Sequence, residues 1–155
     1  MANILNVPHY PQETDGLCLP ACIQMVLAYW GVSTTQRELV QRLGTRPHIG
    51  TPHRRITHLQ FTGLTIHHAA DGDLTTLRSY LERAVPVIVF VQNADLPYWN
   101  EHPSRHALVV IGMEHNIITV LDPGTTSTPH TVPVGDFLLA WDEMDATYAV
   151  MARSL

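Results

Sequence analysis

The sequence has 155 residues, of which 45% are apolar, and a formal net charge of -5. This length and composition are typical of a globular protein, and we expect one domain over residues 1–155. The negative charge, without a basic run to neutralise phosphates, argues against a nucleic-acid partner.

The sequence predicts no signal peptide and no membrane-spanning segment. The longest apolar stretches, residues 21–30 and 85–91, are far too short to cross a bilayer. The two cysteines, Cys18 and Cys22, are placed one turn apart on a helix, where their side chains are poorly set for a disulfide. We therefore expect a protein of a reducing compartment, and the cytoplasm is the simplest interpretation.

The N-terminal half is predicted to contain most of the helices. The strongest signal is a segment that begins near Cys18, ends before Gly31 and is apolar on nearly every side, as buried helices are. Thr35 and Glu38 have the spacing of a capping box, and Asp73 is placed to cap a later helix. In chain order we expect a short edge strand over residues 1–11, the apolar helix, a helix over 34–43, a loop over 45–52, a short helix over 53–61, a strand over 64–70 and a helix over 74–84.

The C-terminal half changes to a strand pattern. Continuous apolar and β-branched runs predict buried strands, and the sequence Asp122-Pro123-Gly124 ends one of them sharply. In chain order we expect a strand over residues 87–91, a polar and aromatic loop over 93–105, strands over 106–111 and 117–121 joined by a turn over 112–116, a loop or edge segment over 125–133, a short helix over 136–141 and a strand over 147–151. Helices followed by a mostly antiparallel meander predict an α+β fold, with the helices packed on the sheet.

Cys18 is the first candidate for chemistry. It is placed at the start of the apolar helix, where free N–H groups and the helix dipole stabilise a thiolate and lower the pKa of the thiol. Gln12, six positions upstream, has a neutral amide that could fold back over the same place and donate to an oxyanion. Covalent acyl transfer requires a sulfur nucleophile with such donors.

His106 and Asp122 would complete a catalytic group. His106 opens one predicted strand and Asp122 ends the next strand of the same hairpin, so antiparallel pairing brings both to one end of the sheet. There His106 can take the thiol proton while Asp122 orients the imidazole and fixes its tautomer. Taken singly, each residue also has an ordinary structural role, as a buried helix cysteine, a strand-end histidine or an aspartate in a turn.

With Gln12, Cys18, His106 and Asp122 in this order, the chain resembles the papain-like cysteine peptidases, and in particular their bacteriocin-processing, double-glycine leader branch in a stand-alone form. The Q-x5-C spacing is similar to that of the family's oxyanion glutamine and nucleophile. The stretch C-L-P-A-C resembles the helix that carries the nucleophile, and H-A-L-V-V-I-G with I-T-V-L-D-P resembles the histidine strand and the Asp-Pro turn. The resemblance covers essentially the whole chain. It implies a papain-like fold and a cysteine peptidase that acts on peptides or proteins without a cofactor.

One departure from the family pattern matters. The chain has Leu17-Cys18-Leu19 where the family commonly has Asp-Cys-Gly, and we expect the Leu19 side chain to narrow the cleft or to change specificity. Tyr98 and Trp99, in the loop before His106, are either core anchors of that loop or walls of the substrate cleft. We take all three as candidate substrate-binding residues.

The many histidines raise the question of a metal site. None has a recognised ligand spacing, and two cysteines separated by three residues are not a usual zinc knuckle, so we expect no metal. The histidines that could be assembled with the two thiols are His53, His58, His67, His68, His102 and His106.

Two other functions stay open at this stage. The same residues would serve a papain-like acyltransferase or peptide ligase, in which an amine or a thiol rather than water releases the acyl group. A catalytically inactive peptide-binding module would keep the fold without turnover, with Leu19 obstructing the cleft. The natural substrate and the oligomeric state are not encoded in any pattern of this sequence.

Overall fold

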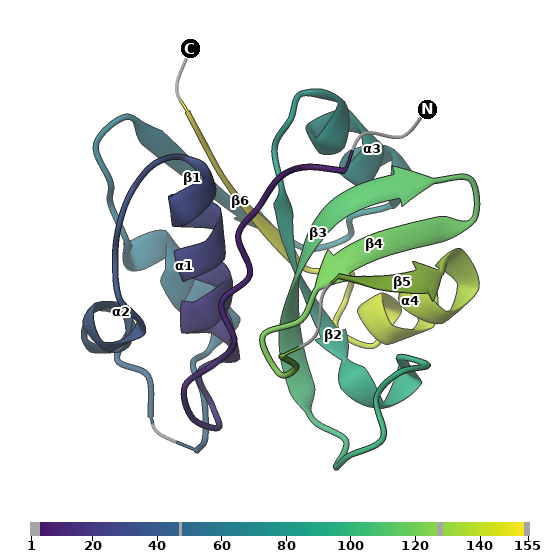
Figure 1. The fold of residues 1–155 in the computed structure, drawn as a ribbon, viewed down its shortest axis with the longest axis horizontal. Coiled ribbons are helices and arrows are strands. Elements are labelled where there is room, and N and C mark those ends of the chain that lie inside the picture. Colours follow the sequence, from purple (N-terminus) through teal and green to yellow (C-terminus); the bar gives the residue numbers. More distant parts are fainter. Residues whose placement is uncertain (1–3, 47, 127–128, 154–155) are drawn as a thin grey trace.

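The computed structural model describes residues 4–46, 48–126 and 129–153. In chain order, its elements are α1 (Cys18–Tyr29), α2 (Gln36–Leu43), the 3-10 helix η1 (His53–His58), β1 (Leu64–Ala69), α3 (Leu74–Glu82), β2 (Val87–Gln92), the 3-10 turn η2 (Asn93–Asp95), β3 (Arg105–Glu114), β4 (Ile117–Leu121), β5 (His130–Pro133), α4 (Val134–Asp142) and β6 (Tyr148–Arg153). The six strands form one antiparallel sheet in the order β1-β6-β2-β3-β4-β5 (Figure 1). Strands β2 to β5 form the predicted meander, and β6 inserts between β1 and β2.

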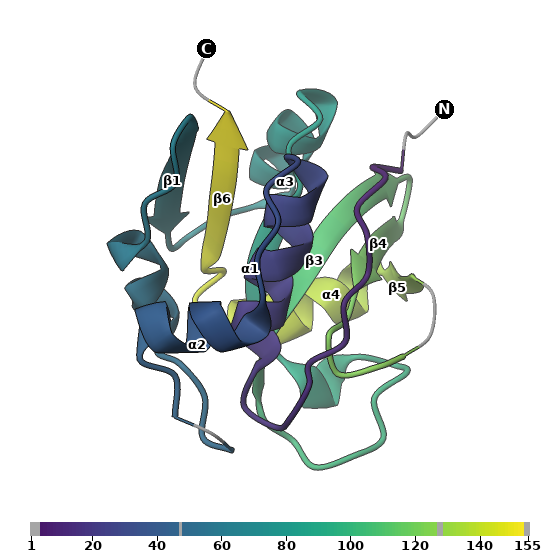
Figure 2. The same ribbon diagram turned by 60° about the vertical axis from the view of Figure 1, so that its left-hand side comes forward.

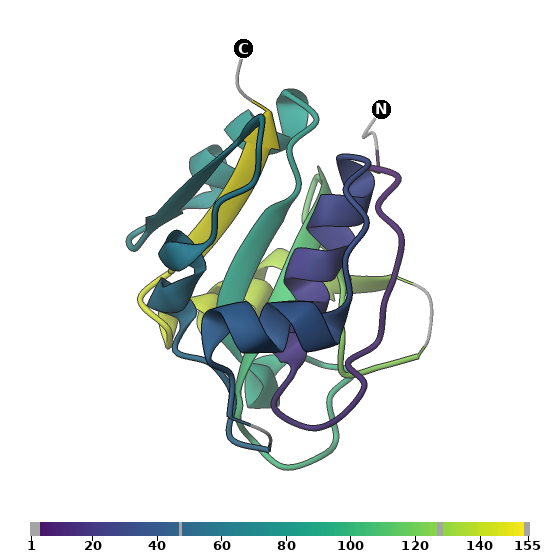
Figure 3. The same cartoon turned by 90° about the vertical axis from the view of Figure 1, so that its left-hand side faces the viewer.

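The strands in the centre of the sheet present alternate side chains to its two faces. In β3, Ala107 and Val109 belong to the apolar layer that includes α1, whereas Leu108 and Val110 belong to the layer that includes residues of α3 and α4. Figures 2 and 3 show α1 lying across the first face, with α2 next to it. The core therefore consists of two apolar layers, one on each side of the sheet.

Helix α1 is buried on almost all sides, as its composition predicts. Ile23, Met25 and Leu27 have no exposed surface. Pro20 lies in the first turn, where its missing N–H group costs little. Leu17 precedes the helix and has no polar side chain that could cap it, so the N–H groups of the first turn remain available around Cys18.

Both predicted helix caps are confirmed. The Thr35 hydroxyl accepts a hydrogen bond from the backbone N–H of Glu38 at 3.1 Å, and Gly44 ends α2 in the left-handed conformation. Asp73 caps α3 by accepting a hydrogen bond from the backbone N–H of Thr76 at 2.8 Å. The local signals thus fixed where these two helices begin.

The prediction of an edge strand at the N-terminus is wrong for residues 4–11, the part of it that the structure describes. Residues 4–11 form an extended segment that runs alongside α1 (Figure 2), and Leu5 donates its backbone N–H to the Ile111 carbonyl at 2.9 Å. Pro8 and Pro11 have no N–H to donate, which prevents a continuous ladder of hydrogen bonds. Residues 1–3 of this prediction lie outside the described residues.

Several element boundaries differ from the prediction, two of them by three residues. The helix expected over residues 53–61 is a 3-10 helix that ends at His58. Strand β3 continues past residue 111 to Glu114, with an irregular register between Val110 and Gly112, so that its turn contains only residues 115–116. Within the described ranges, none of the helices has the length and hydropathy needed to cross a bilayer.

Candidate active site

The starts of α1 and β3 and the end of β4 meet at one end of the sheet (Figure 1). His106 is the second residue of β3, and Asp122 directly follows β4. The Nε2 atom of His106 lies 2.6 Å from Oδ1 of Asp122, and both side chains are almost completely buried. The hairpin therefore places these two predicted residues in direct contact.

Cys18 contacts His106 as well. Its side chain forms a hydrogen bond with the His106 imidazole and receives backbone hydrogen bonds from Ala107 and Leu19. Because Nε2 of His106 faces Asp122, Nδ1 is the ring nitrogen left for the sulfur. Burial alone would raise the pKa of the Cys18 thiol, but these hydrogen bonds and the charge of His106 outweigh it, and the pKa lies below its ordinary value of 9.0.

The contacts of His106 favour its charged form. Burial disfavours the imidazolium, but the hydrogen bonds and charges of Asp122 and Cys18 outweigh burial and raise the pKa of His106 to about 10. Burial likewise opposes the charge on Asp122, but hydrogen bonds from His106, Tyr98 and Gly124 keep the pKa of this carboxyl below its ordinary value. Each of the three shifts therefore favours the charged form of its group, and a thiolate at Cys18, an imidazolium at His106 and a carboxylate at Asp122 would stabilise one another.

The turn that carries Asp122 is held by several further contacts. Asp122 accepts a hydrogen bond from the Gly124 N–H at Oδ1, 2.7 Å away, and from the Tyr98 hydroxyl at Oδ2, 2.6 Å away. Its backbone carbonyl lies 2.9 Å from Nε2 of His9. These contacts fix both the carboxylate and the main chain of the residue.

Gln12 is tied to the same turn. Its backbone N–H donates to the Pro123 carbonyl at 2.7 Å, which fixes the loop before α1 against the Asp122-Pro123 turn. The Oε1 atom of its side chain is buried and has no hydrogen-bond partner among the described residues. A buried polar atom without a partner is rare in native proteins, and a group that serves a ligand is one accepted reason for it.

The three candidate substrate-binding residues have different environments. Leu19 is 2% exposed and belongs to the apolar layer around α1, so its side chain offers almost no surface to a ligand. Tyr98 and Trp99 are half-buried. Trp99 packs near the His106 ring, with 5.2 Å between ring centroids, and it lies so close to Gly124 that a β-carbon there would be 2.9 Å from the indole.

The second cysteine is unlike the first. Cys22 is completely buried one turn further along α1, and burial raises the pKa of its thiol well above the ordinary 9.0. Both cysteines are free. The two thiols therefore differ in accessibility and in the direction of their pKa shifts, which makes Cys22 an internal reference for the reactivity of Cys18.

Sequence reasoning did not find the contacts that hold Asp122. The hydrogen bond from Tyr98 joins residues 24 positions apart, and the stacking of Tyr98 on His130 joins an irregular loop to the first residue of β5. The loop that carries Tyr98 has no periodicity from which a spatial neighbour could be inferred. Only the presence of aromatic residues beside a predicted catalytic histidine pointed to this region.

A metal site is not formed by the histidines named above in the part of the chain that is described. There, no group of three or more His, Cys, Asp or Glu side chains is arranged to hold a metal ion. His53 and His68 instead contact each other, with Nδ1 of the first 2.9 Å from Nε2 of the second.

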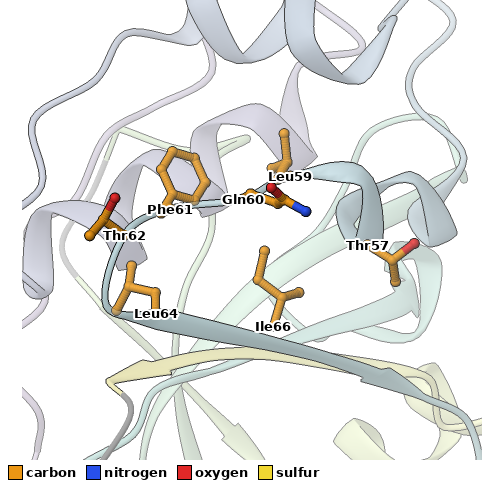
Figure 4. A pocket seen from close by; sticks show the side chains of 7 residues that line it. All are labelled: Thr57, Leu59, Gln60, Phe61, Thr62, Leu64 and Ile66. Atoms are coloured by element: carbon orange, nitrogen blue, oxygen red, sulfur yellow. The ribbon is translucent and has the colours of Figure 1, made fainter.

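Two cavities are lined by residues other than Cys18, His106 and Asp122. The first, of ≈ 580 Å³, lies between the connection after η1 and strand β1 (Figure 4). It is lined by Thr57, Leu59, Gln60, Phe61, Thr62, Leu64 and Ile66. The second, of ≈ 500 Å³, lies beside the N-terminal segment and is lined by Ile4, Leu5, Asn6, Val7, His9, Ile111, Leu121, Thr126 and Pro129.

Comparison with known proteins places this geometry in context. Residues 4–149 match the family described as Peptidase_C39 like family. No curated protein sequence gives a significant match. Among solved structures, the chain is similar to a C39-like peptidase from Bacillus anthracis, with a TM-score of 0.82 and 16% identity over 99% of this chain and 98% of the other.

Two further structures have the same fold. One is the peptidase domain of Streptococcus ComA, a bi-functional ABC transporter of a quorum-sensing pathway, with a TM-score of 0.74 and 21% identity over 94% of this chain and 97% of that one. The other is a double glycine motif protease from an AMS/PCAT transporter in complex with the leader peptide, with a TM-score of 0.68 and 15% identity over 98% and 95% of the two chains. These similarities confirm the predicted α+β, papain-like fold.

Proposed function

The chain belongs to the Peptidase_C39 like family, as its motifs predict, and on this premise we propose that it is a cysteine peptidase in which Cys18, His106 and Asp122 act as the catalytic triad. The observation that carries the proposal is the position of His106, which hydrogen-bonds to Cys18 and, at 2.6 Å, to Asp122. This is the arrangement in which an imidazole activates a thiol and an anion orients the imidazole.

In the proposed reaction, the Cys18 thiolate attacks the carbonyl carbon of the scissile peptide bond. The oxyanion that forms accepts hydrogen bonds from the side-chain amide of Gln12 and the backbone N–H of Cys18. His106 donates its proton to the leaving amine as the C–N bond breaks, which leaves a thioester on Cys18. The neutral imidazole then takes a proton from water, the hydroxide oxygen bonds to the acyl carbon, and the carboxylic acid leaves as the thiolate re-forms.

The role proposed for Gln12 is supported by its attachment to the Asp122-Pro123 turn, which fixes the loop before α1 beside that turn. The substrate proposed is a peptide or an unfolded protein segment. The solved relative in complex with a leader peptide supports this class of substrate. Trp99, half-buried beside the His106 ring, is the side chain proposed to contact the peptide.

The proposal is tested by the pH dependence of Cys18 alkylation with iodoacetamide, followed by mass-spectrometric mapping of both cysteines. We expect Cys18 to react rapidly well below pH 9 because its pKa lies below 9.0, while the buried Cys22 stays unlabelled. The Cys22→Ala variant, with Cys18 as its single thiol, serves as the matched control and should give the same profile. A Cys18 that reacts no faster than a free thiol would contradict the proposal.

A peptide library then distinguishes the reaction from its two alternatives. Hydrolysis adds the mass of water to the acyl product, whereas transfer adds the mass of an added amine or thiol. Tight peptide binding with no acyl-enzyme at Cys18 would instead identify an inactive binding module. We expect hydrolysis, lost in the Cys18→Ala variant.

A further inference from the structure

We propose that Tyr98 is a positioning residue for the proposed reaction, because its hydroxyl holds the Asp122 carboxylate in the orientation that presents Oδ1 to His106. The inference rests on the proposed function and assigns a role to a residue that does not itself touch Cys18 or the substrate carbonyl in this scheme. It replaces a substrate-binding role for the Tyr98 hydroxyl with a role inside the protein.

The first support is the division of donors between the two carboxylate oxygens. Oδ1 of Asp122 faces Nε2 of His106 at 2.6 Å and the N–H of Gly124 at 2.7 Å, while Oδ2 receives the Tyr98 hydroxyl at 2.6 Å. A carboxylate with donors on one oxygen only can turn about its Cβ–Cγ bond. Donors on both oxygens fix that torsion, and here the Tyr98 hydroxyl is the donor to the second oxygen.

The second support is that the Tyr98 ring is itself held in place. It stacks face to face on His130, with 3.8 Å between centroids and 6° between planes. Nε2 of His130 lies 2.9 Å from Oγ1 of Thr125, and that hydroxyl donates to the Asp122 carbonyl at 3.3 Å. The contacts form a closed ring that starts and ends at Asp122, so the tyrosine cannot move without disturbing its neighbours.

The third support is the closure of the loop that carries Tyr98. Asn93, which is completely buried, and Ser104 join the two ends of this loop. The backbone N–H of Asn93 donates to the Ser104 carbonyl at 3.1 Å, the backbone N–H of Ser104 donates to Oδ1 of Asn93 at 2.8 Å, and Nδ2 of Asn93 donates to the Ser104 hydroxyl at 3.0 Å. A loop fastened in this way can hold a side chain in one position although it has no regular structure.

The hydroxyl of Tyr98 is also a permanent donor. Burial, and then the negative charge of Asp122, raise the pKa of Tyr98 far above its ordinary value, so the hydroxyl stays protonated wherever the protein is folded. The other titratable groups around Asp122 are His106 and Cys18 on the reaction side, His9 at the carbonyl, His130 behind the tyrosine ring and the buried Cys22.

Loss of this donor has a defined consequence. An anion that loses a hydrogen bond becomes a stronger base, so in Tyr98→Phe the Asp122 carboxylate should hold the imidazolium of His106 more strongly. The carboxylate should also be less well oriented. The first effect moves the loss of the His106 proton to higher pH, and the second reduces turnover without affecting substrate binding.

The experiment compares Tyr98→Phe with Tyr29→Phe, which also removes one hydroxyl hydrogen bond, that to the Ala84 carbonyl at 2.7 Å, but far from the site. The upper inflection of the Cys18 alkylation profile marks the loss of the His106 proton. In Tyr98→Phe we expect it to rise by about half a pH unit. For a peptide found to be cleaved, we expect kcat to fall about tenfold with KM unchanged. Tyr29→Phe should change neither quantity.

The inference would be overturned if a folded Tyr98→Phe variant had the same Cys18 alkylation profile and the same kcat as the original protein. It would also be overturned if the upper inflection of that profile moved to lower pH. The proposed function would survive either result, because Cys18 would still react as an activated thiol. Should Tyr98→Phe fail to fold, His130→Ala, which keeps the hydroxyl but removes the stacked ring, must shift the inflection in the same direction for the inference to stand. A Cys18 that is not activated in the original protein contradicts the proposed function before any variant is made.

Discussion

The contacts His106–Asp122 and His53–His68 both join a histidine nitrogen to a polar atom at hydrogen-bond distance, 2.6 Å in the first and 2.9 Å in the second. Burial disfavours the imidazolium in both places. In the first contact, the Asp122 carboxylate and the Cys18 thiol outweigh burial and raise the pKa of His106 to about 10. The charge of the partner, rather than burial, therefore decides whether the histidine holds a proton.

The second contact has the opposite outcome. The pKa of His53 lies below its ordinary value because of burial and the nearby Arg105 and Arg54, which outweigh the opposite effect of Asp145. The pKa of His68 is lowered by burial and by the other histidines beside it. Two histidines in contact through nitrogens need one N–H and one lone pair, so the contact cannot survive protonation of both rings.

The largest expected difference between the two contacts is in how much a histidine-to-glutamine substitution reduces peptide cleavage. His106→Gln removes the group that exchanges a proton with the Cys18 thiol, and we expect kcat/KM for peptide cleavage to fall by about 10²–10⁴-fold, the usual contribution of general acid–base catalysis. His53→Gln makes the same change in the other contact and should keep kcat/KM within about twofold. Both are measured on folded protein with one peptide. Equal losses in the two variants would contradict the role proposed for His106.

Removing the negative charge of Asp122 should make the His106–Asp122 contact behave more like the His53–His68 contact. Asp122→Asn keeps the shape of the side chain but removes its negative charge. It also places an amide N–H₂ group opposite the Tyr98 hydroxyl or the Gly124 N–H, which are themselves donors. We expect the pKa of His106 to fall from about 10, and kcat/KM to fall about 10- to 100-fold. The upper inflection of the Cys18 alkylation profile should therefore move to lower pH.

The matched control for this change is Asp142→Asn, which removes the same charge from an exposed position at the end of α4. It should leave the alkylation profile in place. An Asp122→Asn profile that superimposes on the original one would mean that the carboxylate charge does not hold the His106 proton.

The converse experiment places a carboxylate in the second contact. Glutamate is about as long as histidine, so His68→Glu brings a negative charge to His53, and we expect the pKa of His53 to rise by about one pH unit relative to His68→Gln. The two variants differ only in charge, which makes the glutamine form the control. Titration of the His53 ring protons by NMR measures the difference. The same pKa in both variants would contradict the view that the charge of the partner decides the outcome.

Much of the fold could be predicted because its signals are local. The caps at Thr35 and Asp73 act within a few residues, and the central strands are continuous apolar runs that can be recognised directly. The hairpin geometry that joins His106 to Asp122 also follows from neighbouring segments of the chain. These features depend on short stretches, so one sequence is enough to infer them.

The remaining features depend on contacts between distant segments. The extended path of residues 4–11 is set by what it packs against, and the burial of Leu19 depends on the way α1 rests on the sheet. The hydrogen bond of Tyr98 to Asp122 requires a loop without periodicity to close in one particular way. No propensity or spacing carries that information, because it arises only when the core has formed.

The smallest expected difference between the two contacts is in how each changes the free energy of unfolding with pH. The folded-state pKa of His106 lies above its unfolded value of 6.5, so its contribution to stability is complete below pH 6.5 and is lost as the pH rises toward about 10. For His53 and His68 the folded-state pKa is lowered, so below pH 6.5 the unfolded chain binds protons more readily than the folded chain. The free energy of unfolding should therefore decrease as the pH falls from 6.5 toward 5 because of this second contact.

Replacing both residues, in His53→Gln with His68→Gln, should remove that part of the acid-side decrease. The pair is half-exposed, so solvent screening limits the change to less than about 1 kcal/mol between pH 6.5 and 5. Urea unfolding at several pH values measures it as the difference between the two stability curves, and His58→Gln, an exposed position in the same 3-10 helix, is the control for the substitution itself. Stability curves that stay parallel below pH 6.5 would show that His53 and His68 take up protons equally in the folded and unfolded chains. Only the His106–Asp122 contact would then change the free energy of unfolding with pH.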